Sequence, residues 1–148
     1  MKSPEAAIRA VLIADDSVSD QVGSRIYPVI APSTAELPFL VYRRGSIRRE
    51  ATFTGPMGNP TVQLELTIMD STYESVRELS DTVRKSIDGW TGVVDNVLIH
   101  QTFLSNELDG FAQLQGAEMP AVYTVTQLYD LIWEEINHHG EDKLHNTT

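Results

Sequence analysis

The chain contains 148 residues, close to the usual size of one domain, so two full-sized domains are not expected. Hydrophobic residues make up 41% and charged residues 22%, the composition of an ordinary globular chain long enough to bury a core. The absence of cysteine excludes disulfide scaffolds, thiolate zinc sites, iron–sulfur clusters and cysteine nucleophiles.

The formal net charge is −10, from 11 Lys and Arg against 21 Asp and Glu. An acidic surface repels phosphate groups, so binding of nucleic acid or of an anionic membrane by the whole surface is disfavoured. The apolar runs are far shorter than the ~20 residues that cross a bilayer. The N-terminus lacks the apolar stretch of a secretory signal. We expect a soluble protein that is not exported by that route.

A first helix is predicted after Ser3, which can cap it, with Pro4 at the first helical position. We expect this helix to end near Asp15, and a short second turn to begin at Asp16 or Ser17. The three prolines of the following segment predict an ordered extended connection, because proline lacks a backbone donor. These prolines are Pro28, Pro32 and Pro38.

Two strands are then expected, residues 39–44 and 61–69, each with alternating apolar and polar side chains. One buried face favours antiparallel pairing. The connection between the strands, residues 45–60, is interpreted as a long hairpin whose tip projects from the body. A capping box at residues 71–74 begins a second main helix, which carries one apolar stripe on its buried side. The stripe comprises Val76, Leu79, Val83 and Ile87.

Beyond Gly89, the expected stop of that helix, residues 93–104 predict a strand around residues 97–99 and residues 106–116 predict a polar loop. Residues 121–133 predict a last strand. The sequence thus predicts one α+β domain over residues 1–137, in the order α–β–β–α–β–β, and a polar tail over residues 138–148. About four antiparallel strands and two main helices packed on them are expected.

Signatures of catalysis are absent: the chain has no phosphate-binding loop, dinucleotide fingerprint, zinc-protease motif or nucleophile elbow. We therefore expect no catalytic residues, no cofactor and no metal. A metal site in the tail at His138, His139 and His145, near Glu141 and Asp142, is conceivable, but a solvated tail is preferred. His100 is expected to be half-buried and hydrogen-bonded rather than a general base. The neighbouring carboxylates 15–16, 134–135 and 141–142 are not expected to share a proton.

Four of the 11 basic residues lie within seven positions on the predicted hairpin: Arg43, Arg44, Arg48 and Arg49. Three interpretations stay open. The arginines can protect an edge strand against aggregation, dock an acidic partner or a second copy through ion pairs, or contact phosphate directly.

The chain resembles the tail-terminator or tail-completion family of long-tailed bacteriophages and related prophages. The resemblance covers residues 3–135. It is carried by the opening helix of residues 3–12, by Gly23-Ser24-Arg25-Ile26-Tyr27-Pro28, and by Pro38-Phe39-Leu40-Val41-Tyr42. A strand over residues 62–70, a helix with Tyr73 and Val76 near its start, and a late strand ending near Ile132-Trp133 follow in the same order.

This resemblance implies a structural function in the virion and no catalytic residues. Such proteins form a ring, usually a hexamer, on the head-proximal end of the tail tube, after assembly in the host cytoplasm. The ring stops tube polymerisation and joins the head, so the implied partners are other copies, the tail-tube protein and a head-completion or connector protein. DNA only passes through the channel, and no membrane is involved.

Two alternatives come from other classes of protein. One is a small metal-dependent or hydrolytic enzyme, which a pocket with convergent titratable groups would support. The other is a nucleic-acid-binding module that uses the hairpin of residues 43–49, which would show salt-sensitive DNA binding.

Overall fold

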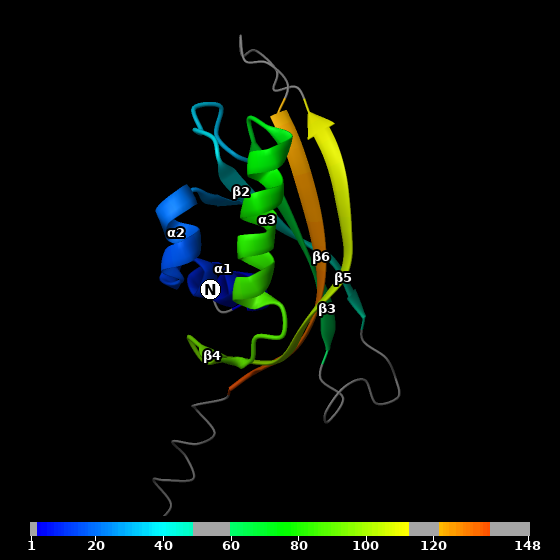
Figure 1. Ribbon diagram of the computed structural model, residues 1–148. Helices are drawn as coiled ribbons and strands as arrows, with labels where there is room; N and C mark the ends of the chain where they lie inside the picture. Colours follow the sequence, from blue (N-terminus) through cyan, green and yellow to red (C-terminus); the bar gives the residue numbers. More distant parts are fainter. Residues whose placement is uncertain (1–2, 49–59, 113–121, 137–148) are drawn as a thin grey trace, which may run out of the picture.

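A single curved sheet is covered on one face by helices (Figure 1). The computed structural model describes residues 3–48, 60–112 and 122–136, with the backbone alone described at 46–48. Within these ranges it has three helices and six strands. They are α1 (Pro4–Ala14), α2 (Asp16–Val22), β1 (Ile26–Pro28), β2 (Phe39–Arg48), β3 (Thr61–Asp70), α3 (Tyr73–Ile87), β4 (Gly92–Val94), β5 (Val97–Ala112) and β6 (Val122–Glu135).

The strands lie in the order β1-β2-β3-β6-β5-β4. Strand β1 runs parallel to β2, and all other neighbouring pairs are antiparallel. The fold is therefore α+β, as predicted, but the expected sheet of about four antiparallel strands is wrong, because the observed sheet is mixed and has six strands. The expected order α–β–β–α–β–β is also wrong, because the described chain follows the order α–α–β–β–β–α–β–β–β. Strands β1 and β4 each contain three residues, too few to produce an alternating pattern in the sequence.

Each helix begins after a capping residue, which for α1 is the predicted one and for α2 and α3 lies one residue away from the predicted position. Ser3 caps α1, where its hydroxyl accepts a hydrogen bond from the Ala6 amide at 3.2 Å. Asp15 caps α2, one residue before the predicted position, and its carboxylate accepts from the Ser17 amide at 3.0 Å. The predicted capping box begins at Ser71, but the residue that caps α3 is Thr72, whose hydroxyl accepts a hydrogen bond from the Ser75 amide at 3.1 Å. Each cap satisfies a helical N–H that would otherwise lack a partner.

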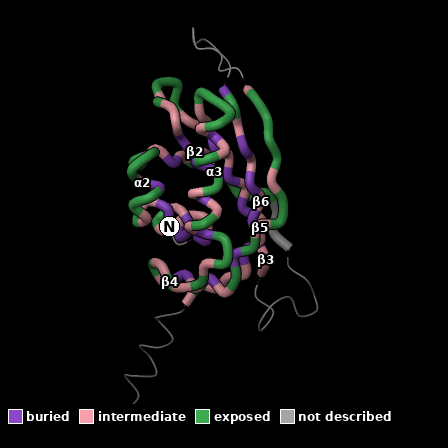
Figure 2. Tube along the Cα trace, viewed as in Figure 1, coloured by how far each residue is buried: buried purple, intermediate pink, exposed green. Residues whose placement is uncertain are grey.

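The core lies between the helices and the sheet, where the buried residues of Figure 2 concentrate. All four residues of the predicted stripe on α3 are fully buried, which confirms the prediction for this helix. They pack in one cluster with the alternate residues of β3 and β6. The strand residues of this cluster are Val62, Leu64, Leu66, Ile68, Val125, Tyr129 and Leu131.

Strand β5 is much longer than predicted. The expected polar loop over residues 106–116 is wrong for residues 106–112, which continue the strand. Two irregularities, between Ile99 and Gln101 and between Leu104 and Asn106, shift the register with β6. Each shift breaks the two-residue period that identifies a strand in a sequence. The polar residues that follow therefore show no alternation, and the sequence pattern there resembles that of a loop.

Several predicted features lie outside the described residues: the tip of the hairpin with Arg49, and the tail over residues 138–148 with its histidines. In the described part of the chain, no helix has both the length and the apolar character needed to cross a membrane.

Candidate interaction surfaces

The first two arginines of the predicted cluster, both on β2, pair with carboxylates of their own chain. Arg43 lies directly opposite Glu65 in the β2–β3 ladder, and its Nε donates to the Glu65 carboxylate. The Arg43 side chain remains 59% exposed. Such an exposed cross-strand pair stabilises the sheet weakly and leaves the guanidinium accessible on the face that the helices do not cover.

The Arg44 side chain lies on the other face of the sheet, where it binds a carboxylate of α1. Its Nε donates to Glu5 Oε2 at 2.9 Å and its Nη2 donates to Glu5 Oε1 at 2.6 Å. Burial by itself would raise the pKa of the Glu5 carboxyl, but the hydrogen bonds and charge of Arg44, together with local hydrogen bonds, hold it below the usual value. This two-pronged pair fixes the first turn of α1 on β2.

Arg48 is the last residue of β2, opposite Thr61 in the register, and Arg49 lies outside the described residues. The structure therefore places three of the four predicted residues along one strand. It assigns two of them, Arg43 and Arg44, to contacts within the chain.

A second charged cluster, which no sequence pattern predicts, lies between α3 and β5, toward the other edge of the sheet from β2. Arg77 of α3 donates to Glu107 at 3.0 Å and to Asp109 at 3.2 Å, and Asp81 lies 3.9 Å away. Arg84 lies 3.9 Å from the same Asp81, so two guanidinium groups face three carboxylates and the cluster carries an excess of one negative charge. No signal in the sequence brings these residues together, because Glu107 and Asp109 fall in the segment that was interpreted as a loop.

The cluster continues into the core through a chain of hydrogen bonds. The Gln127 side-chain amide donates to Glu107 Oε2 at 2.8 Å and to the Ser80 carbonyl at 3.0 Å. The Tyr129 hydroxyl donates to Gln127 Oε1 at 2.7 Å. Burial, with a smaller effect from nearby Asp88 and Glu107, raises the pKa of Tyr129 far above its usual value. A satisfied polar network of this kind fixes the position of β5 and β6 against α3.

Exposed aromatic side chains lie beside the acidic cluster, where β5 ends and β6 begins. The ring centroids of Tyr73 and Tyr123 are 6.2 Å apart, and those of Phe111 and Tyr123 are 6.4 Å apart. Phe111 is 67% exposed. The Tyr73 hydroxyl donates to Asp109 at 2.8 Å, which joins the aromatic group to the cluster. Exposed aromatic residues with polar neighbours are typical of protein interfaces.

A further apolar projection follows β1. The Val29 backbone has φ 66°, an uncommon conformation for a β-branched residue, and the Ile30 amide donates to the Pro28 carbonyl at 2.7 Å across it. Val29 is 68% exposed and Ile30 is 78% exposed. The turn holds two apolar side chains in solvent, where they gain nothing from the core of their own domain.

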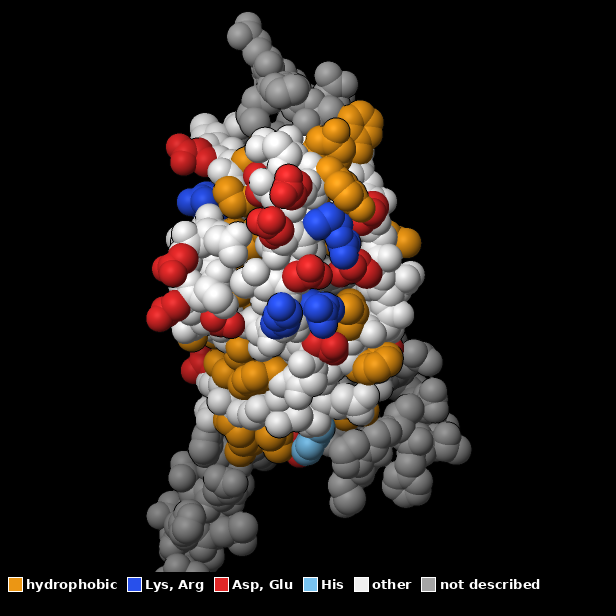
Figure 3. Space-filling view, viewed as in Figure 1, with side chains coloured by type: hydrophobic (Ala, Val, Ile, Leu, Met, Phe, Trp, Pro, Cys, Tyr) orange, Lys and Arg blue, Asp and Glu red, His pale blue; other side chains and the backbone are white. Residues whose placement is uncertain are grey.

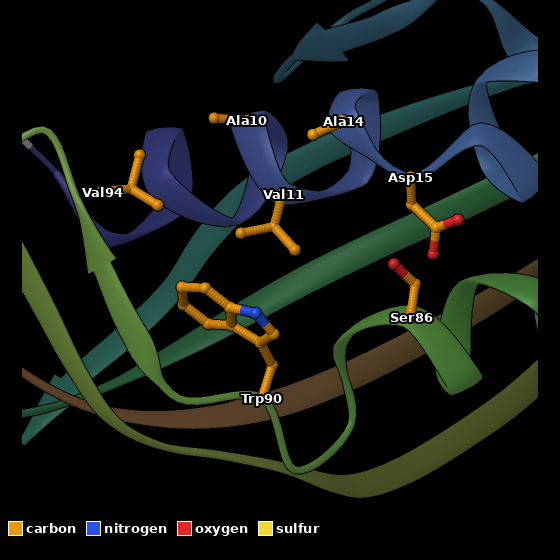
Figure 4. Close-up of a pocket in the computed structure, with 7 residues that line it drawn as sticks. All are labelled: Ala10, Val11, Ala14, Asp15, Ser86, Trp90 and Val94. Carbon is orange, nitrogen blue, oxygen red and sulfur yellow. The ribbon is translucent and has the colours of Figure 1, made fainter.

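A shallow groove of about 540 Å³ lies between α1 and the segment after α3. Figure 4 shows the Trp90 ring below Val11, and Asp15 and Ser86 facing each other at one end. Among the described residues, Asp15 is the one titratable group that lines the groove. The hydroxyls of Ser17 and Ser86 lower the pKa of this carboxyl. Asp15 also caps α2, so this carboxyl has a structural role at the end of the groove.

The remaining candidates for chemistry have structural roles. His100 Nε2 lies 2.8 Å from Glu134 Oε1, and its side chain is 25% exposed, so the prediction of a half-buried, hydrogen-bonded histidine is confirmed. In the part of the chain that the structure describes, no group of three or more His, Cys, Asp or Glu residues could hold a metal ion.

Acidic side chains are spread over the helix-covered side of the molecule, with a smaller group of basic ones among them (Figure 3). The exposed face of α3 accounts for part of this pattern, with Glu74, Glu78 and Asp81 toward its start and Arg84 and Lys85 toward its end. The net charge of −10 is therefore not localised in one site.

The described chain is a small α+β subunit in which helices cover one face of a six-stranded sheet. The family described as "Tail completion protein gp17" matches residues 6–118, and the chain belongs to this family. It is a family of structural phage proteins and not a known enzyme family, so the protein is a structural component of a phage tail.

A solved structure has the same fold. One chain of the virion of a native gene transfer agent particle superposes with a TM-score of 0.65 over 89% of this chain and 95% of the other. The sequence identity is 12%, so this likeness shows the fold alone. Among curated proteins, no sequence matches.

Proposed function

We propose that this protein forms a ring at the head-proximal end of the tail tube, with six copies as the family resemblance implies. The ring ends polymerisation of the tube and provides the surface that joins the head. Its partners are other copies of the chain, the tail-tube protein and a head-completion or connector protein, and DNA passes through the channel. The family match over residues 6–118 supports this proposal.

One structural observation carries the ring. A closed ring of identical subunits needs two different, complementary patches on each subunit. The β2 side of the sheet carries Arg43, which pairs with Glu65 but remains 59% exposed, and the β5 side carries Glu107 and Asp109, which share Arg77 of α3. Strands β3 and β6 separate these patches in the sheet. Patches of opposite charge on opposite sides of a subunit favour head-to-tail contacts over self-association of one patch.

The same proposal gives the chain no turnover and no cofactor. Among the described residues that line the groove, Asp15 is the one titratable group, and Arg44 and Arg77 each pair with a carboxylate of the same chain. An acidic surface also suits a channel for DNA, because repulsion of phosphate prevents tight binding.

The experiment is a comparison of tail tubes in the presence and absence of the protein. Tail-tube protein is polymerised alone and with the purified chain, and tube lengths are measured by electron microscopy. We expect the chain to shorten the tubes and narrow their length distribution. The double variant Arg48→Glu, Arg49→Glu should fold normally and fail to cap, and raised salt should weaken wild-type capping in the same way because it screens exposed pairs. Equal tube lengths with and without the wild-type chain would contradict the proposal.

A further inference from the structure

Part of the β5 edge lacks a neighbouring strand in the described structure. Strand β4 pairs only with Val97–Ile99. The next outward-facing backbone groups are covered by the end of α3, where the Gly89 amide donates to the Thr102 carbonyl and the Asp88 carboxylate accepts from the Leu104 amide. From residue 105 to residue 112, no described strand pairs with the outer edge of β5. Unpaired backbone groups on an edge are a template for another strand.

Strand β2 has a similar edge on the opposite side of the sheet. Strand β1 pairs with β2 from Leu40 to Tyr42, and the Val29 amide donates to the Tyr42 carbonyl where β1 ends. From Arg43 to Arg48, no strand among the described residues covers the outer edge of β2. The two open edges therefore lie on opposite sides of one sheet, and each spans a short stretch of strand.

The topology fixes how these edges would meet between two copies. Strands β2, β3, β6 and β5 alternate in direction, so β5 runs opposite to β2. If a second copy continues the sheet with its helices on the same side, its β2 lies antiparallel to β5 of the first copy. Antiparallel pairing is the more stable arrangement per residue.

The side chains that this arrangement brings to one face have opposite charge. On β2, Leu40, Tyr42 and Arg44 lie opposite residues of β3 whose side chains are in the core. These three side chains therefore lie on the face that the helices cover. On β5, Glu107 and Asp109 lie on the same face, because they pair with Gln127 and Val125, which are both 0% exposed. Arg44 of one copy, which also pairs with its own Glu5, would then stand across from Glu107 and Asp109 of the next, where three carboxylates share Arg77 and Arg84. Opposite charges across a strand pair stabilise it.

We propose that the outer edge of β5, residues 105–112, pairs with the outer edge of β2, residues 43–48, of a second copy of this chain. The pairing continues the sheet from one subunit to the next and is the contact that closes the ring. This inference rests on the proposed function, since only a ring supplies each edge with a neighbour.

Backbone alternation provides a selective test at Phe111. Thr102 and Leu104, whose side chains face the helices, direct their backbone groups outward. Phe111 lies on the same face, opposite Tyr123, so its N–H points to the outer edge. Phe111→Pro removes that donor and leaves the bonds to β6, whereas Phe111→Ala removes the ring and keeps the donor. We expect the proline variant to associate about tenfold or more weakly than the alanine variant, with both folded by circular dichroism.

Cross-linking identifies the partner edge directly, because the natural chain has no cysteine. Leu108 and Arg43 both lie on the face that the helices leave open. Leu108→Cys and Arg43→Cys proteins are mixed and oxidised under assembly conditions, with the Leu108→Cys protein alone and the Arg43→Cys protein alone as controls. We expect disulfide-linked dimers at several times the control yield in the mixture. Asn106→Cys in place of Leu108→Cys covers a register that differs by two residues.

The outcomes separate this inference from the function on which it rests. Rings that cap tubes but give no β5–β2 cross-link, or that form equally well with Phe111→Pro, overturn the edge pairing and leave the proposed function intact. Cross-linking of Leu108→Cys to itself overturns it in favour of a twofold contact. A wild-type chain that forms no ring, with or without tail tubes, overturns both.

Discussion

Arg44 and Glu5, 39 positions apart in the sequence, form a two-pronged ion pair with N–O distances of 2.9 and 2.6 Å. This pair joins the middle of β2 to the first turn of α1. A carboxylate at this position also interacts favourably with the positive end of the helix dipole. The same contact therefore stabilises the fold and withdraws one arginine of the cluster from free solution.

The Glu5–Arg44 pair predicts a specific pH dependence. The pKa of Glu5 is held below its ordinary value of 4.5, so its contribution to stability is full above that value and is lost as the pH falls through the lower, folded pKa. Glu5→Gln should reduce the free energy of unfolding by about 1 kcal/mol at pH 7. The difference between variant and wild type should shrink as the pH falls below 4.5. Urea unfolding at pH 7 and at pH 3 measures both quantities, and a difference that grows at low pH would refute this account.

Leu66 tests the orientation of the central strand. It is 1% exposed in the cluster between β3 and α3, so Leu66→Ala should destabilise the protein by about 2–5 kcal/mol. Thr67→Ala, on the opposite face of the same strand, is the matched control and should cost much less. Chemical denaturation of both variants checks this prediction. Equal losses of stability would show that the two faces of β3 are not distinguished by burial.

The buried amide of Gln127 is expected to be sensitive to truncation. Gln127→Ala removes the partner of the Tyr129 hydroxyl, the Ser80 carbonyl and one Glu107 oxygen, so we expect a loss of about 2–4 kcal/mol. Tyr129→Phe breaks only one of these bonds and should cost about 1–2 kcal/mol. Thermal unfolding of the two variants gives the order. The network would be unimportant if the tyrosine variant lost as much stability as the glutamine variant.

Much of the fold could be predicted where a periodic pattern was long enough to identify one element. The stripe on α3 and the alternation in β3 extend over whole elements, and both were placed on the correct faces. Strands β1 and β4 are too short to leave such a pattern. In β5, two register shifts and exposure of one edge remove the apolar–polar period, so the sequence predicts a strand around residues 97–99 but a polar loop from residue 106.

The interaction surfaces were harder to predict than the fold, because contacts between distant residues leave no local trace. The arginine cluster is visible as a composition bias, but its pairing with Glu5 and Glu65 depends on how α1 and β3 lie against β2. The acidic cluster around Arg77 joins two elements through the tertiary fold. Charge density in the sequence indicated a surface but not which of its charges are already neutralised.

DNA binding provides a separate test of the nucleic-acid alternative. Arg43 and Arg44 already face carboxylates, and the chain carries a net charge of −10. We therefore expect no binding to a fluorescent duplex at physiological ionic strength, measured by anisotropy. Binding that weakens as salt is raised and is lost in the double variant Arg48→Glu, Arg49→Glu would favour the alternative instead.

The position of the protein on the tail tests the central claim most directly. Tail tubes assembled with the wild-type chain are imaged by electron microscopy, with the mass of the free and bound protein determined in parallel. We predict a ring of identical subunits at one end of each tube. Single subunits distributed along the tubes, or tubes whose two ends both lack the protein, would contradict the account.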